Sequence, residues 1–113
     1  MSFKNASTKK DGRVFFLSLL DLSNAILAFF YEGSMKLGTL AIALPAAVNA
    51  QVVTSSTLLG GKHLLSARAI AERIASIFGK MSLASVHVET SESEAIRIAV
   101  ALLDDLSPKR QSQ

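Results

Sequence analysis

"RVFFLSLLDLSNAILAFFYEGSMKLGTLAIALP", residues 13–45, holds three apolar runs separated by short polar connections. Asp, Ser and Asn in "DLSN" are turn-forming residues, and "EGSMK" is a glycine-containing connection of hairpin length. The stretch therefore predicts three successive strands at residues 13–20, 25–31 and 37–44, the last ended by Pro45, which cannot donate to a strand ladder.

Basic residues precede the same stretch, as they do in a secretory signal or a membrane anchor. Asp21 and Asn24 interrupt the apolar residues, and the uninterrupted run is shorter than the roughly 20 residues that span a bilayer. A carboxylate at the centre of a span is also costly. We therefore interpret this region as strands rather than as a signal or an anchor.

Downstream of Pro45 the pattern first continues and then changes its period. Residues 51–59, "QVVTSSTLL", read as a fourth strand that is more polar than the others. Apolar residues then recur at three- and four-residue steps from Ala67 to Phe78, which predicts an amphipathic helix ended by Gly79. Residues 83–89 alternate as a fifth strand, and Ser91 with Glu94 fits a capping box before a second helix that ends at Leu106.

This order of elements predicts an α+β domain with an antiparallel sheet and two helices packed on one face. We expect residues 13–106 to form a single domain. Residues 1–12 are expected to be a flexible basic N-terminal extension, and residues 107–113 a flexible C-terminal tail.

The composition narrows the classes of function. The net charge of the 113 residues is +3, but residues 14–108 hold six Lys or Arg against eight Asp or Glu, a balance of −2. The basic charge thus lies at the two ends, which favours solvated tails over a nucleic-acid patch. There is no cysteine, so the chain has no disulfide, thiolate metal site or thiol nucleophile, as is compatible with a reducing compartment.

The first three strands are apolar on both faces, whereas a sheet that is wet on one side should alternate. Two helices can cover only one face, so the other must meet a partner, and sheet-to-sheet packing with a second copy or a paralogue is expected. The residues predicted for this interface are Phe15, Leu17, Leu19, Leu27, Phe29 and Tyr31.

The sequence holds few candidates for catalytic or ligand-binding residues. "TSSTLLGGKH", residues 54–63, lacks two positions of a phosphate-binding loop, because Ser56 stands for its first glycine and His63 for its Ser or Thr. An anion at the following helix N-terminus, or a hydroxyl nucleophile with Lys62 and His63, is the weaker hypothesis, which nucleotide titration by calorimetry would test. We expect no catalytic residue, no cofactor, no metal, no nucleic acid and no membrane partner.

Two segments resemble a known family. "AILAFFYEGSMKLGTLAIALP" (residues 25–45) and "VVTSSTLLGG" (residues 52–61) are similar to the small eukaryotic proteasome assembly chaperone 3 and, less distinguishably, to its sister chaperone 4. The resemblance covers residues 13–106. It implies a non-enzymatic chaperone of the cytoplasm and nucleus that pairs as a homodimer or as a heterodimer with a paralogous small chaperone. It also implies that the pair binds α-type proteasome subunits while the α-ring assembles.

The family motif further suggests a contact with the client protein through Lys36, Thr54, Ser56 and Gly60. The alternative that the sequence leaves open is a small dimeric scaffold or regulatory module with a different client protein, because an apolar sheet face does not identify the protein that binds it.

Overall fold

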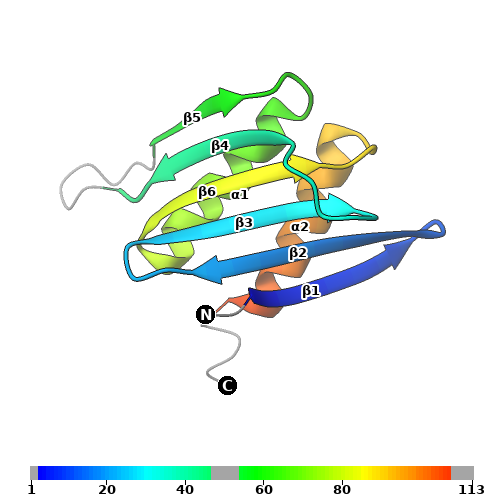
Figure 1. The fold of residues 1–113 in the computed structure, drawn as a ribbon, viewed down its shortest axis with the longest axis horizontal. Helices are drawn as coiled ribbons and strands as arrows, with labels where there is room; N and C mark the ends of the chain where they lie inside the picture. The colour runs from blue at the N-terminus through cyan, green and yellow to red at the C-terminus, as the bar shows by residue number, and fades with distance from the viewer. Residues whose placement is uncertain (1–2, 47–53, 108–113) are drawn as a thin grey trace.

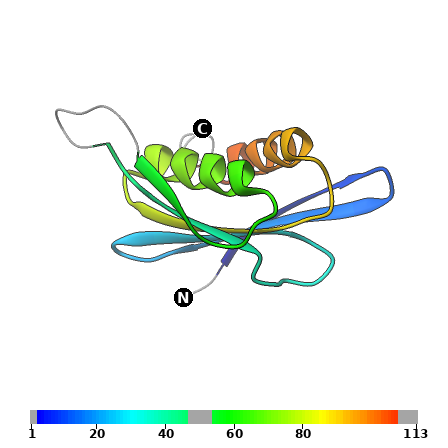
Figure 2. The same cartoon turned by 90° about the horizontal axis from the view of Figure 1, so that it is seen from above.

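The computed structural model describes residues 3–46 and 54–107, which form one six-stranded sheet with two helices on the same face (Figures 1 and 2). The strand order is β1-β2-β3-β6-β4-β5. The elements are β1 (Phe3–Lys10), β2 (Arg13–Asp21), β3 (Ala25–Glu32), β4 (Thr39–Leu44), β5 (Thr54–Leu59), α1 (Leu64–Phe78), β6 (Met81–His87) and α2 (Glu92–Leu106). The predicted α+β class is confirmed.

The sheet is antiparallel except for one pair. β6 lies between β3 and β4, parallel to β3 and antiparallel to β4. The chain reaches this central place after α1 has crossed the sheet, so β6 inserts between β3, which ends at Glu32, and β4, which ends at Leu44. Sequence periodicity identified this strand but could not place it.

The N-terminal residues correct one expectation. Residues 3–10 form an edge strand rather than a flexible extension, and β1 pairs with β2 along its whole length, from Phe3 opposite Leu20 to Lys10 opposite Arg13. Asp11 and Gly12 both have positive φ, at 54° and 76°, as a two-residue type I′ hairpin turn requires. The Asp-Gly pair was the available signal, but the polar residues of "FKNASTKK" hid the strand.

The core lies between the helices and one sheet face. The sheet offers small side chains there, including Ala28, Ala41, Ala43 and Ala84, so that the helices can approach closely. The side chains that α1 and α2 bury against them include Ala67, Ile70, Ala71, Ile74, Ala95, Ile98, Ala99, Leu102 and Leu103.

Both helix ends that the sequence predicted are confirmed. Gly79 takes the left-handed conformation (φ 67°) and its amide donates to the Ala75 carbonyl at 2.9 Å. The Ser91 hydroxyl accepts from the Glu94 amide at 3.2 Å, which is the first half of a capping box. The Glu94 carboxylate does not complete the box but pairs with Lys10 of β1 and with Arg97. Within the described residues, neither helix is long and apolar enough to span a membrane.

Candidate interaction surface

The face of the sheet opposite the helices is apolar and carries no described element over it. We call it the open face. Strand register places its side chains side by side on β2, β3, β6 and β4. Its large apolar members are Phe16, Leu20, Leu27, Phe29, Tyr31, Leu40, Ile42, Leu44 and Leu83, nearly all partly exposed, with Leu44 at 50%. A continuous apolar surface of this kind marks a protein interaction site.

Aromatic contacts order one half of the open face. Phe16 stacks on Tyr31 with ring centroids 5.2 Å apart, and Phe3 meets Phe29 edge-on at 6.2 Å. These cross-strand pairs fix the side chains before any partner arrives, which lowers the entropy lost on association.

Two polar side chains within the open face are hydrogen-bonded inside the domain. The Ser18 hydroxyl donates to the Asn5 side-chain oxygen at 2.6 Å, and the Ser85 hydroxyl accepts from the Gly38 amide at 2.9 Å. Among the described residues, no buried side-chain nitrogen or oxygen lacks a hydrogen-bond partner. The Ser18 and Ser85 hydroxyls therefore need no hydrogen-bond partner from a surface that covers this face.

The structure divides the six residues predicted for the dimer interface. Leu27, Phe29 and Tyr31 lie on the open face, and their role in pairing stays a prediction. Phe15, Leu17 and Leu19 do not lie there, because their side chains point to the helices and are at most 2% exposed. Side chains alternate along a strand, so the open face of β2 carries Phe16 and Leu20 instead.

The residues of the family motif fall into two groups. Lys36 is exposed in the β3–β4 connection, and Thr54 and Ser56 are exposed on the edge strand β5, opposite Leu44 and Ile42. Their contact with a client stays a prediction.

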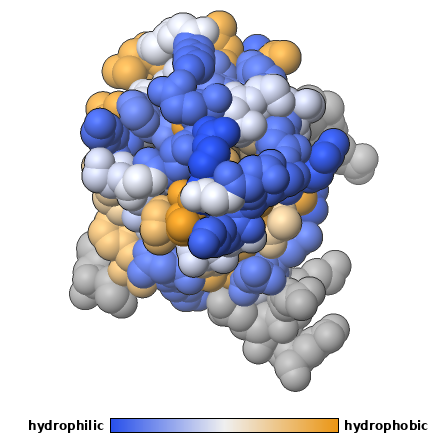
Figure 3. Space-filling model, turned by 90° about the vertical axis from the view of Figure 1, so that its right-hand side faces the viewer, coloured by the Kyte–Doolittle hydropathy of each residue, from blue (hydrophilic) through white to orange (hydrophobic). Residues whose placement is uncertain are grey.

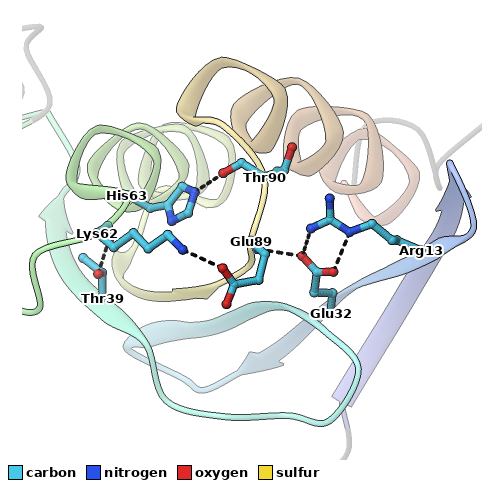
Figure 4. Close-up of polar contacts among 7 residues, drawn as sticks. All are labelled: Arg13, Glu32, Thr39, Lys62, His63, Glu89 and Thr90. Carbon is cyan, nitrogen blue, oxygen red and sulfur yellow. Dashed lines mark hydrogen bonds and ion pairs between the residues drawn. The ribbon is translucent and has the colours of Figure 1, made fainter.

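At Gly60 the packing of the domain itself requires a glycine. Its φ is +101°, and a Cβ there would lie 2.7 Å from the Thr39 Cα. The Thr39 hydroxyl also donates to the Lys62 carbonyl (Figure 4). The two segments that carry the family motif therefore contact each other, at the first residue of β4 and in the turn just before α1.

A chain of polar contacts crosses the end of the sheet where β3 and β6 finish (Figure 4). The Arg13 guanidinium grips the Glu32 carboxylate with two hydrogen bonds, and Glu32 accepts from the Glu89 amide at 2.7 Å. The Glu89 carboxylate pairs with Lys62 at 2.6 Å. Hydrogen bonding to Arg13 lowers the pKa of Glu32, and the bond from Lys62 lowers the pKa of Glu89. Figure 3 shows this end as mainly hydrophilic, with smaller apolar areas between the polar side chains.

The groups considered for nucleophilic chemistry are engaged elsewhere. The His63 ring, which is buried, donates from Nε2 to the Thr90 carbonyl, and Lys62 is held by Glu89. On β5, the Ser55 hydroxyl donates to Glu72 and accepts from Arg68 at 3.0 Å. Neither Lys62 nor His63 is thus hydrogen-bonded to a hydroxyl of β5, and the acceptor of the Ser55 hydroxyl is the Glu72 carboxylate. In the described part of the chain, no group of three potential metal-binding side chains comes together.

Glu92 occupies the position that an anion would take at the start of α1. Its carboxylate accepts from the Leu65 amide at 3.0 Å, from the Ser66 amide at 2.8 Å and from the Ser66 hydroxyl. Burial alone would raise the pKa of Glu92, but the hydrogen bonds from Ser66 and Leu65 outweigh it, so the pKa is lowered. Glu92 is the first residue of α2, yet its side chain caps the other helix, because the fold brings the two helix starts together.

We expect Glu92→Gln to lower the free energy of unfolding at pH 7 by about 1 kcal/mol, as loss of a charged helix cap does. Because the pKa of Glu92 is depressed in the folded protein, its contribution is full above the ordinary value of 4.5 and is lost as the pH falls through the folded pKa. The difference between wild type and variant should therefore shrink as the pH drops below 4.5. Urea titrations at a series of pH values measure it.

Asp104→Asn is the matched control, because the Asp104 side chain is 52% exposed and, among the described residues, pairs with a single cation, Arg73, at 3.6 Å. It should change stability at pH 7 by less than about 0.5 kcal/mol. A wild-type advantage over Glu92→Gln that stays constant down to acidic pH would contradict the capping role.

Comparison with solved structures identifies a match over nearly the whole chain. A chain of the crystal structure of a chaperone complex for yeast 20S proteasome assembly aligns with a TM-score of 0.64 and 17% sequence identity, covering 94% of this chain and 96% of that chain. No protein-family model matches the sequence, and no curated protein sequence is significantly similar to it. The chain therefore has the fold of a proteasome assembly chaperone.

Proposed function

We propose that this protein is a non-catalytic assembly chaperone that binds α-type subunits of the proteasome core particle and promotes formation of the α-ring. The observation that carries the proposal is the open face, an apolar surface prepared for a partner on a domain whose fold matches a chain of a proteasome assembly chaperone complex. The engaged state of His63, Lys62 and Ser55 supports a role in binding rather than in catalysis.

The open face would serve dimerisation with a second copy or with a paralogous small chaperone. Sheet-to-sheet packing at about 10 Å would bury Leu27, Phe29 and Tyr31 against equivalent side chains of the partner. The exposed ends of the sheet and the helices would then remain for the client subunit. The proposed place of action is the cytoplasm and nucleus.

Affinity purification of the tagged full-length protein from its source cell, read by mass spectrometry, tests the function. We expect α-type proteasome subunits and a small protein of the same fold among the specific partners. A variant with Phe29→Asp should lose the small protein. Absence of α-type subunits from the wild-type purification would refute the chaperone role, and a different specific client would identify the protein as another kind of scaffold.

A further inference from the structure

A hollow of about 310 Å³ lies between the edge strand β1 and the helix α2, outside the open face. The residues that line it come from these two elements alone. They are Ser7, Thr8, Lys9, Lys10, Arg97, Ile98, Ala101, Leu102 and Asp105. The apolar side chains of α2 thus form a floor beside the backbone of an edge strand.

The outer edge of β1 is available for pairing. β1 stands at the end of the strand order, so among the described strands it pairs only with β2. An edge strand presents unpaired amide and carbonyl groups to a further strand. An extended peptide laid along such an edge, beside a neighbouring helix, is an established mode of peptide recognition in which alternate side chains enter pockets.

The edge formed by β1 and α2 carries more positive than negative charge, which favours an acidic binding partner. β1 carries Lys4, Lys9 and Lys10 and no acidic residue. The α2 side chains that line the hollow add one cation, Arg97, and one carboxylate, Asp105, so cations still outnumber carboxylates along this edge. Lys10 and Arg97 share a single carboxylate, that of Glu94. Side chains on adjacent strands lie about 5 Å apart, so a strand added beside β1 is favoured if it is acidic.

A second copy of the chain does not meet this requirement. Two β1 strands placed edge to edge would bring the lysines of one copy beside those of the other, and like charges on adjacent strands are destabilising. The lysines thus discourage self-association through this edge while leaving it open to a strand of opposite charge.

We propose that β1 and α2 form a docking groove for an extended, acidic segment of a partner protein. Side chains that the segment directs to the helix side meet Lys10, Arg97 and Ala101, whereas those directed to the opposite side meet Lys9, because side chains alternate along a strand. The groove lies at the edge of the sheet on the helix side, so it can be filled while the open face is covered. This inference does not depend on the proposed chaperone function.

The test uses the full-length protein and a fluorescein-labelled, acetylated peptide of eight residues that alternates Glu and Val. Fluorescence anisotropy should show saturable binding with a Kd below about 1 mM, weakened by added salt because the contacts are charged. A Lys-Val peptide of the same length should bind at least tenfold more weakly. A Glu-Val peptide methylated on alternate backbone amides should also bind more weakly, since it lacks main-chain donors.

Two charge reversals provide the matched comparison. Arg97→Glu reverses a cation that lines the groove, and Arg73→Glu reverses an exposed, ion-paired arginine outside it on α1. Arg97→Glu should weaken binding of the Glu-Val peptide at least tenfold, whereas Arg73→Glu should change it by less than twofold.

Amide chemical shifts of the labelled wild-type protein give an independent readout that no variant can compromise by misfolding. Titration with the peptide should move resonances of β1 and α2. The proposal is overturned if the Glu-Val peptide does not saturate, if the two reversals have equal effects, or if the shifted amides lie on the open face.

Discussion

Two carboxylates introduced on opposite faces of the sheet should have opposite consequences. Leu17→Asp places an unpaired carboxylate among core side chains at a position that is fully buried, so we expect the domain to lose more than about 4 kcal/mol and to unfold. Phe29→Asp places the same group on the open face, where water reaches it, and the domain should stay folded. Circular dichroism separates the two outcomes directly.

The folded Phe29→Asp variant then tests the interface. A charge at the centre of an apolar contact costs an association at least about 2 kcal/mol, which corresponds to a roughly 30-fold weaker Kd. Light scattering coupled to size exclusion, at micromolar concentration, should give a monomer for this variant and a dimer for the wild type or for its pair with a paralogue. A folded wild-type protein that stays monomeric, alone and with the paralogue, would be incompatible with pairing through the open face.

Gly38→Ala should be among the most destabilising substitutions in the connection between β3 and β4. A Cβ at this position would lie 2.6 Å from the Val86 carbonyl carbon and closer still to its oxygen. Backbone atoms cannot move aside as a flexible side chain can, so β4 would have to separate from β6. We expect a loss of about 3 kcal/mol, the upper end of the usual range for overpacking, measured by urea denaturation.

Gly61→Ala is the control for Gly38→Ala. Apart from its two chain neighbours, no described residue has a heavy atom within 4 Å of a Cβ built on Gly61. Its effect should stay within about 0.5 kcal/mol, in the range of ordinary surface substitutions. Equal losses in the two variants would show that the connection to β4 tolerates a side chain and that the clash is relieved elsewhere.

Gly60 and Gly61 differ in whether the structure requires a glycine, although both belong to the segment that resembles the family. Both glycines look alike in "LLGGKH", yet only Gly60 has a positive φ and a Cβ position filled by Thr39. Part of the motif is therefore retained by the packing of one strand start against one helix start. That reason is invisible in the sequence, because Thr39 and Gly60 are 21 residues apart.

Local patterns were enough to predict most elements. Apolar runs gave β2, β3 and β4, a helical period gave α1 and α2, and Ser91 and Gly79 marked two helix ends. These features depend on neighbours within a few residues, so they can be read along the chain. β1 was not predicted, because a solvent-exposed edge strand needs no apolar residues and its polar sequence gave no strand pattern.

The sequence alone established that this protein is a small α+β domain with more apolar sheet surface than two helices can cover. The assignment of each side chain to a face came only with the folded chain. Phe15, Leu17 and Leu19 were grouped with Leu27, Phe29 and Tyr31, yet register puts the first three under the helices. When a strand is apolar at every position, the pattern does not show which side chains point to the helices and which point to the opposite face of the sheet. Only the side on which α1 and α2 pack decides which residues form the core and which remain for a partner.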